Sequence, residues 1–104
     1  RILAGPYATQ KLGDMGATIW KVERPDGGDD TRAWGPPFHR GISTYFMAVN
    51  RSKRSITLDL KKGDAVLERL VKGCDVIVEN FRPGTLEKLG WTWERIRALN
   101  PRAI

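Results

Sequence analysis

Three aspartates and two arginines lie close together in one glycine-rich segment. Asp26, Asp29 and Asp30 surround a pair of glycines, and Arg24 and Arg32 flank them. A carboxylate metal site would need converging oxygens, and the spacing of an EF-hand calcium loop is absent. The segment therefore favours a turn-rich loop in which the aspartates pair with the neighbouring arginines.

The only histidine and the only cysteine lack partners for nucleophilic or acid–base catalysis. His39 lies in a proline-rich segment, with no serine, cysteine or aspartate at a recognisable catalytic spacing. A structural or solvent-facing histidine is the expectation. Cys74 falls on the apolar face of a predicted helix, which predicts a buried, inert thiol. These counts also argue against a metal site built on imidazole or thiolate ligands, so no metal is expected.

The charge balance favours an anionic partner. Lysine and arginine total 18 against 12 acidic residues, which gives a net charge of +6. The basic residues are dispersed apart from Arg51, Lys53 and Arg54, too few for a nucleic-acid stripe. The glycine-rich phosphate signatures are also missing. Phosphate recognition would therefore depend on scattered basic side chains and on backbone N–H groups at strand ends.

Tryptophan is the other residue type that could contact a ligand, because its ring can stack on bases. Trp20 lies in a predicted strand and Trp93 in a predicted helix, so packing in the core is the expectation for both. Trp91 lies outside the predicted helices and strands. Trp34 lies in the long loop and is the one tryptophan that we expect to contact a ligand.

The elements that would position these residues alternate between helix and strand. Apolar spacing predicts helices at 6–15, ended by Gly16, and at 64–73, capped by Asp64. Residues 24–43 show no period, and the type of a short apolar element at 45–49 stays open. The sequence further predicts strands at 18–23, 55–60 and 75–79, and short helices capped by Thr85 and Thr92. This alternation predicts an α/β fold with a parallel sheet.

An internal repeat indicates where a ligand would bind. Residues 16–25 resemble residues 73–83: in both, a helix ends near a glycine and an apolar strand follows, finishing in glutamate with Arg-Pro close behind. Ligands of open α/β sheets bind beyond the carboxyl ends of the strands. We therefore expect the residues after Glu23 and Glu79 to line one crevice.

Length sets further limits. A chain of 104 residues is one domain at most. It has no apolar run long enough to span a membrane and no secretory signal, so the expected location is the cytoplasm, or the mitochondrion in a eukaryote. The first residues are typical of the end of a strand and the last of the start of one. The chain is thus expected to be a domain truncated at both ends.

A series of short motifs resembles the amino-terminal part of the family III CoA-transferases, which include formyl-CoA transferase and carnitine CoA-transferases. The resemblance covers essentially all 104 residues. It implies a Rossmann-like fold and an interlocked homodimer. The motifs are Leu3–Tyr7, Lys21–Pro25, Gly28–Arg32, Trp34–Phe38, Asn50–Ile56, Leu58–Lys61 and Val78–Gly84.

The same resemblance implies the chemistry. Family members move CoA between carboxylic acids through an aspartate, which forms an acyl anhydride and then an aspartyl-CoA thioester. That aspartate lies beyond Ile104, so residues 1–104 form a partial CoA-binding domain without a catalytic residue, which we expect to be inactive alone. The implied partners are acyl-CoA and a carboxylic acid, with no metal, nucleic acid or membrane.

The resemblance also implies which residues of this chain form the CoA site. In the family, the turn at Ile2, Leu3 and Ala4 lines the thioester end through backbone groups, although Leu3 stands where formyl-CoA transferase has glutamine. Lys88 stands where that enzyme has arginine, and so keeps the charge but loses the bidentate fork. The remaining positions are Arg24 near the adenosine phosphates, Leu58 and Lys61 beside the adenine and its phosphates, and Asn80 and Phe81 along the pantetheine–diphosphate arm.

Three alternatives stay open. The α-methylacyl-CoA racemases share the fold, but the segments Trp34–Phe38 and Glu79–Phe81 are more like those of transferases. A basic nucleic-acid-binding module would bind with a steep salt dependence and would discriminate little between CoA and other polyanions. An assembly domain without a ligand would self-associate and would not respond to CoA.

Overall fold

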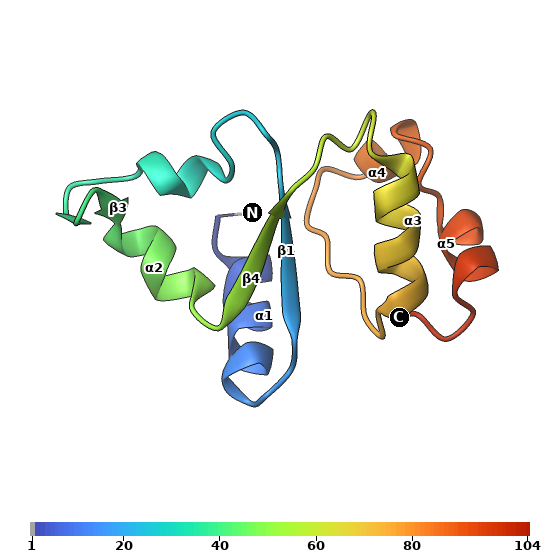
Figure 1. Cartoon of the computed structure of the whole chain (residues 1–104), viewed down its shortest axis with the longest axis horizontal. Helices are drawn as coiled ribbons and strands as arrows, with labels where there is room; N and C mark the ends of the chain where they lie inside the picture. Colours follow the sequence, from blue (N-terminus) through green and yellow to red (C-terminus); the bar gives the residue numbers. More distant parts are fainter. Residues whose placement is uncertain (1) are drawn as a thin grey trace. The chain divides into compact units, whose positions relative to one another are not determined.

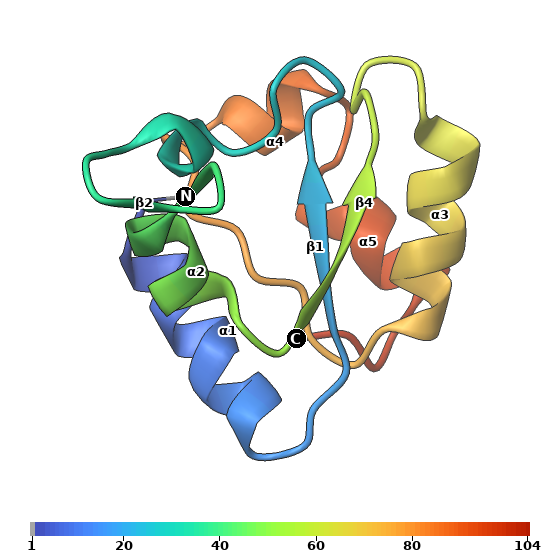
Figure 2. The ribbon, with the colours of Figure 1, turned by 60° about the vertical axis from the view of Figure 1, so that its left-hand side comes forward.

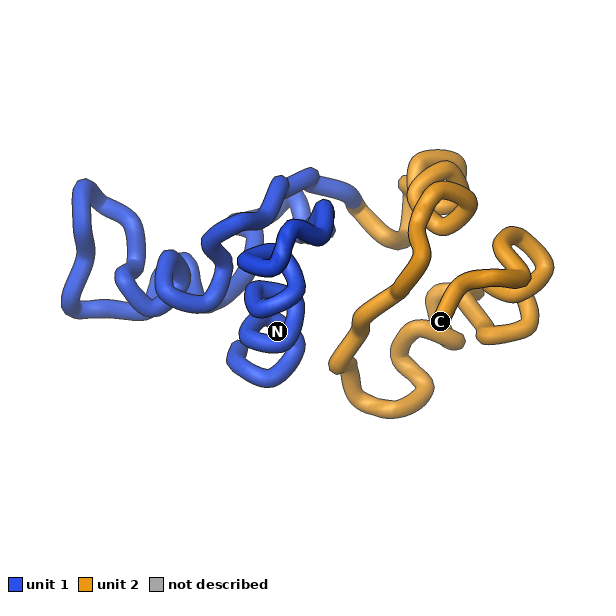
Figure 3. The backbone as a smooth tube through the Cα atoms, turned by 90° about the horizontal axis from the view of Figure 1, so that it is seen from below, with its two compact units in different colours: residues 1–58 blue, residues 59–104 orange. Residues whose placement is uncertain are grey.

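The computed structural model describes residues 2–104, and the described residues divide into two compact units, 2–58 and 59–104 (Figure 3). Each unit has its own helices and its own packed side chains. We therefore describe each unit by itself.

The first unit is built around two parallel strands (Figure 1). β1 (Ile19–Glu23) pairs with β4 (Lys53–Thr57), in a register that runs from Ile19 opposite Lys53 to Glu23 opposite Thr57. Helix α1 (Ala4–Asp14) packs against β1 and α2 (Thr44–Asn50), and α2 leads into β4 (Figure 2). β1, α2 and β4 thus form a βαβ unit. The predicted α/β fold with a parallel sheet flanked by helices is confirmed.

The long segment between β1 and α2 is ordered, although its sequence shows no period. It contains the 3-10 helix η1 (Asp30–Ala33) and a small hairpin of β2 (Phe38–His39) and β3 (Ile42–Ser43). Positive φ angles of 50° and 78° at Arg40 and Gly41 make the two-residue turn of type I′. Ser43 caps α2 by accepting a hydrogen bond from the backbone N–H of Phe46. The short apolar element predicted at 45–49 is therefore helical.

The second unit packs three helices around a small core. These are α3 (Asp64–Gly73), α4 (Thr85–Lys88) and α5 (Trp93–Leu99). Val71, Trp91, Ile96 and Ala103 are buried at its centre. The predicted cap at Thr92 is confirmed, because its hydroxyl accepts the N–H of Arg95 at 3.3 Å.

Two predicted caps were wrong. Gly63 and Gly84 occupy the cap positions of α3 and α4, in place of Asp64 and Thr85. The carboxylate of Asp64 instead accepts hydrogen bonds from Trp91 Nε1 at 3.1 Å and from Arg95 Nη2 at 2.9 Å. Gly84 has a φ of 80°, which favours glycine at the entry to α4.

Two predicted strands also differ from the structure. β4 ends at Thr57, because the chain turns at Asp59, whose carbonyl oxygen accepts hydrogen bonds from the N–H groups of Lys62 and Gly63. The segment 75–79 is not part of a strand. Its backbone makes two hydrogen bonds with Ile104: Ile77 N donates to Ile104 O at 2.8 Å, and Ile104 N donates to Asp75 O at 3.1 Å. Within residues 2–104, no helix is both long and apolar enough to cross a membrane.

Candidate functional site

Arg24 and Leu58 lie side by side at the carboxyl ends of the two parallel strands. Arg24 follows the last residue of β1 and Leu58 follows the last residue of β4. The backbone N–H of Leu58 donates to the carbonyl oxygen of Glu23 at 2.8 Å, which extends the strand pairing to this point. We call the edge formed by Arg24 and Leu58 the strand-end rim. It is the position at which open α/β sheets bind their ligands.

The carboxylate of Glu23 anchors the loop behind this rim. Arg32 donates to both of its oxygens at 2.8 Å, Ser55 Oγ donates at 2.6 Å and the backbone N–H of Asp29 donates at 2.9 Å. The Glu23 side chain is only 2% exposed. The hydrogen bonds from Arg32 lower the pKa of Glu23 to about 2, and those from Ser55 and Asp29 add to them against the opposing effect of burial. Glu23 is therefore a buried anion with a full set of donors.

A second buried carboxylate organises the first turn of η1. Asp29 accepts a hydrogen bond from Lys21 Nζ at 2.7 Å and two from Thr31, at 3.0 Å from its N–H and at 2.7 Å from its hydroxyl. Burial by itself would raise the pKa of Asp29, but these donors outweigh it and hold the pKa well below the usual range. Glu23 and Asp29 together fix residues 24–33 against the sheet, which explains the order of a segment without periodicity.

Arg24 projects from this loop with its guanidinium held in place. Its Nε donates to the backbone carbonyl of Asp26 at 2.7 Å, and its Nη2 donates to the carboxylate of Asp30 at 2.6 Å. The side chain is 57% exposed, so the cation stands at the surface of the rim. The expected pairing of an aspartate with a neighbouring arginine is present for Asp30 with Arg24, whereas Asp29 pairs with a lysine and Arg32 pairs with Glu23.

The Ile2–Ala4 turn lies at the start of α1 and contacts both helices of the first unit. Leu3 O accepts the N–H of Tyr7 at 2.7 Å, and Ile2 O accepts the hydroxyl of Tyr45 at 3.4 Å. The side chains of Ile2 and Leu3 are half-exposed. The ring of Trp34 lies 5.3 Å from that of Tyr45. The loop tryptophan is thus linked to this turn through Tyr45.

The remaining expected site residues lie in the second unit. Lys61 lies in the turn after Asp59, and Lys88 is exposed at the end of α4. Asn80 is exposed, and Phe81 is half-buried with its N–H bonded to Glu79 Oε2 at 2.8 Å. Because Glu23 and Glu79 belong to different units, a crevice shared by the residues that follow them stays a prediction.

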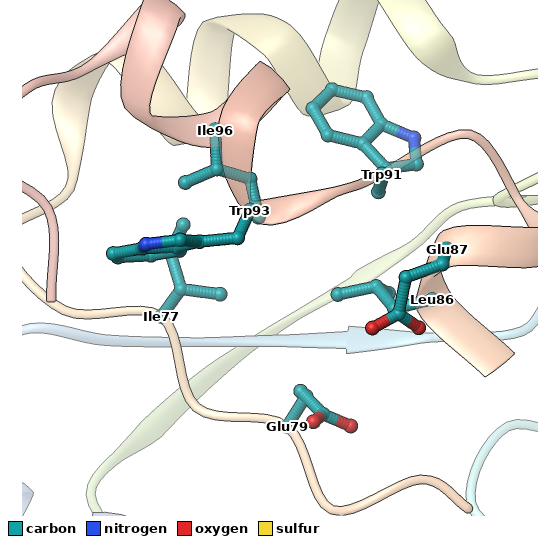
Figure 4. Close-up of a pocket in the computed structure, with 7 residues that line it drawn as sticks. All are labelled: Ile77, Glu79, Leu86, Glu87, Trp91, Trp93 and Ile96. Carbon is teal, nitrogen blue, oxygen red and sulfur yellow. The ribbon is translucent and has the colours of Figure 1, made fainter. Parts of the chain in front are cut away.

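The second unit has a pocket of its own, of about 160 Å³ (Figure 4). None of the expected site residues lines it. Two carboxylates in its lining disfavour a phosphate ligand, because like charges repel. The pocket is lined by Ile77, Glu79, Leu86, Glu87, Trp91, Trp93 and Ile96.

The tryptophans differ from expectation. Trp20 and Trp93 are 50% and 48% exposed, whereas Trp91 is 2% exposed and forms the centre of the second unit's core. Trp20 lies on the open face of a two-stranded sheet, with the Arg54 guanidinium 5.7 Å from its ring. The sequence pattern indicates which residues share one face of a strand or helix. It does not show which face the neighbouring elements cover.

The histidine and the cysteine are the remaining candidates for chemistry. His39 is exposed in β2. Cys74 is half-buried, and burial raises the pKa of its thiol, in agreement with an inert cysteine. In the part of the chain that the structure describes, no three histidine, cysteine or acidic side chains form a group able to hold a metal ion.

Comparison with known proteins shows the family to which this chain belongs. The profile of CoA-transferase family III matches residues 1–104. The chain belongs to this family. Among curated members it is 51% identical over 106 residues to succinyl-CoA:glutarate CoA-transferase of Mus musculus, covering 100% of this chain and 24% of the relative. It is 50% identical to formyl-CoA:oxalate CoA-transferase of Rhodopseudomonas palustris (strain TIE-1), covering 99% and 25%.

Solved structures agree with this assignment. A CAIB/BAIF family protein from Brucella suis superposes with a TM-score of 0.92 at 50% identity, over 100% of this chain and 29% of that protein. Rv3272 from M. tuberculosis superposes with a TM-score of 0.89 at 42% identity, over 100% and 28%. The chain therefore spans about a quarter of the length of these CoA-transferase family III relatives.

The sequence pattern alone does not reveal the two buried carboxylates that anchor the loop of this family III chain. It places Glu23 at the end of a strand and Asp29 in a loop. The available signal was a charged residue beside an apolar strand. That signal does not reveal partners such as Ser55, which lies 32 residues from Glu23.

Proposed function

We propose that the chain is the CoA-binding, amino-terminal part of an enzyme that transfers CoA between carboxylic acids. The match of residues 1–104 to CoA-transferase family III carries this proposal. The relatives compared above are named for succinyl-CoA with glutarate and for formyl-CoA with oxalate. The two names share the exchange of CoA between acids and differ in the acids.

The reaction would use an aspartate that lies after residue 104. Its carboxylate attacks the acyl-CoA carbonyl, forms a mixed anhydride and expels the CoA thiolate. The thiolate then attacks the aspartyl carbonyl, which releases the first acid and leaves an aspartyl-CoA thioester. The second acid reverses the two steps and leaves as its CoA thioester. A covalent intermediate divides one difficult exchange into easier steps.

Residues 2–104 would hold the CoA. Arg24 at the strand-end rim supplies an exposed guanidinium for the phosphates, and Leu58 beside it supplies an apolar contact for the adenine. The Ile2–Ala4 turn would present its backbone to the thioester. Lys61, Lys88, Asn80 and Phe81 belong to the second unit, and their proposed contacts with CoA rest on the family resemblance alone.

The proposed enzyme is a homodimer in the cytoplasm. Support for the dimer comes from the family resemblance, which implies an interlocked homodimer. Light scattering after gel filtration of the full-length protein tests it, and a monomer at every concentration would contradict it.

The test of CoA binding is titration calorimetry on the full-length protein. We expect Arg24→Ala to weaken CoA binding about tenfold or more, because a charge-assisted hydrogen bond contributes about 1.5–3 kcal/mol and a tenfold change is about 1.4 kcal/mol. Arg54→Ala is the matched control, since Arg54 is exposed near the amino ends of the same strands. Equal losses in both variants would favour diffuse electrostatics, as in a nucleic-acid-binding module.

The position of the nucleophile has its own test. Incubation of the isolated 104-residue chain with radiolabelled acyl-CoA should leave no label on the protein, whereas the full-length enzyme should acquire a label that hydroxylamine removes. A hydroxylamine-sensitive adduct on a carboxylate within residues 1–104 would overturn this part of the proposal.

A further inference from the structure

The ammonium group of Lys53 joins the two helices of the first unit. Lys53 is the first residue of β4, and its Nζ donates to Pro6 O of α1 at 2.7 Å. It also donates to two oxygens at the end of α2, Val49 O at 2.9 Å and Asn50 Oδ1 at 3.0 Å. Pro6, Val49 and Asn50 are all buried. Three hydrogen bonds to uncharged oxygens thus hold one cation between two helices.

The ammonium group of Lys53 suits these three acceptors. An ammonium carries three N–H donors, one for each of the three acceptors. The last carbonyl groups of a helix lack partners within the helix and favour a nearby cation, so the end of α2 is a suitable place for a lysine. A neutral side chain here would remove this donor from Val49 O and Asn50 Oδ1, which is costly, and would leave Pro6 O with the hydroxyl of Thr9 at 3.1 Å.

The pKa of Lys53 reflects the same position. Burial first, and then Lys21 in β1, lower the pKa of Lys53 to about 8, against the opposing effect of Asp29 before η1. Because the pKa is lowered, the ammonium gives way to an amine with only two N–H donors as the pH rises through about 8. One of the three acceptors then loses its donor.

The contact at Pro6 leads directly to the Ile2–Ala4 turn. Pro6 lies in the first turn of α1, and the N–H of the next residue, Tyr7, donates to Leu3 O at 2.7 Å. Tyr45, in the first turn of α2, reaches the same segment at Ile2 O. The position of this turn therefore depends on how α1 is held against α2, and Lys53 bonds to both helices.

We propose that Lys53 is a positioning residue for acyl transfer: its ammonium holds the first turn of α1 against the end of α2 and thereby fixes the Ile2–Ala4 turn for the thioester. The inference rests on the proposed function of that turn. All three N–H donors of Lys53 bond to oxygens of the protein, so none is left for CoA. Removal of Lys53 should therefore affect the reacting end of the substrate and leave the nucleotide end, which Arg24 binds, unchanged.

The experiment compares Lys53→Met with Arg54→Met in the full-length protein. Both substitutions remove one positive charge from neighbouring positions of β4, but Arg54 is exposed. For Lys53→Met we expect kcat to fall at least tenfold with the Kd of free CoA changed less than twofold, and the amide of Tyr7 to exchange hydrogen at least tenfold faster. Arg54→Met should change none of these quantities.

Several results would overturn the inference. One is an unchanged Tyr7 exchange rate in Lys53→Met, and another is an equal loss of kcat and of CoA affinity, which indicates general destabilisation. If Lys53→Met does not fold, the NMR shift of the Tyr7 amide is followed from pH 6.5 to 9.5 in the wild type and in Lys53→Arg. A transition near pH 8 in the wild type alone supports the inference, and its absence overturns it. Exchange and NMR need no turnover, so a wild type without transferase activity would refute the proposed function and leave this test intact.

Discussion

Each oxygen of the Glu23 carboxylate accepts a hydrogen bond from the Arg32 guanidinium, and both distances are 2.8 Å. The pair joins the end of β1 to η1 and so fixes the loop from which Arg24 projects. Bidentate pairs of this kind are among the strongest polar contacts in proteins, and here the carboxylate is buried. The order of the strand-end rim therefore depends on Glu23.

We expect Glu23→Gln to lower the free energy of unfolding by about 2–4 kcal/mol, because the substitution leaves the cation of Arg32 without its buried anion. Urea unfolding followed by circular dichroism measures the change. Ser55→Ala is the control: it removes one donor to the same carboxylate and should cost about 1 kcal/mol. A Glu23→Gln variant as stable as Ser55→Ala would show that the charge of Glu23 is not needed.

The lowered pKa of Glu23 also predicts acid sensitivity. The carboxyl group stabilises the fold above its ordinary pKa of 4.5, and that contribution is lost as the pH falls toward about 2. The loss amounts to about 3 kcal/mol at about 1.36 kcal/mol per pKa unit. Asp29 acts in the same direction. Urea unfolding at pH 6, 4.5 and 3 should show a shallower decline for Glu23→Gln than for the wild type, and equal declines would refute the assignment.

The two glycines beside the hydrogen bonds of Glu23 allow a comparison of two matched substitutions. Gly27 and Gly28 have φ angles of 71° and 70°, so alanine is strained by about 1–2 kcal/mol at either position. A Cβ on Gly28 would come within 2.7 Å of Glu23 Oε2, whereas a Cβ on Gly27 would meet nothing within 4 Å. We expect Gly28→Ala to be less stable than Gly27→Ala by at least about 1 kcal/mol. Equal thermal unfolding of the two variants would contradict this packing.

In the second unit, Trp91→Ala should cost about 3–5 kcal/mol, because Trp91 is 2% exposed at the centre of the core and its indole N–H bonds to Asp64. Trp93→Ala is the comparison, since Trp93 is half-exposed and should cost about 1 kcal/mol or less. Denaturant unfolding of both variants decides the point. Equal costs would place Trp93 in the core as the sequence led us to expect.

The helices, which depend on local signals, agree with the prediction, although the caps at Asp64 and Thr85 do not. The apolar spacing of Leu67, Leu70 and Val71 and the cap at Thr92 concern neighbours along the chain, and the helices follow them. The segment 75–79 is as apolar as β1, but a strand needs a partner along its length. The two backbone hydrogen bonds of this segment to Ile104 do not make a strand pairing, so apolarity was not sufficient.

The candidate site was predicted in part, for the same reason. Arg24 and Leu58 meet because each follows a strand of one parallel pair, which the α/β pattern implies. The buried anchors Glu23 and Lys53 depend on partners that are distant in the chain, such as Ser55 and Pro6. Only the three-dimensional packing shows the donors and acceptors that compensate for their burial.

The parallel pairing of β1 with β4 has a consequence for the order of folding. The two-residue turn at Arg40 and Gly41 joins adjacent segments, and such hairpins form within about 1–10 μs. β1 and β4 meet only after the whole intervening stretch, with its hairpin and α2, has been closed into a loop, and contacts of this kind slow folding. The bond between Glu23 and Ser55 spans the same loop. We therefore expect the strand-end rim to be among the last parts of the first unit to form, after its helices and hairpin.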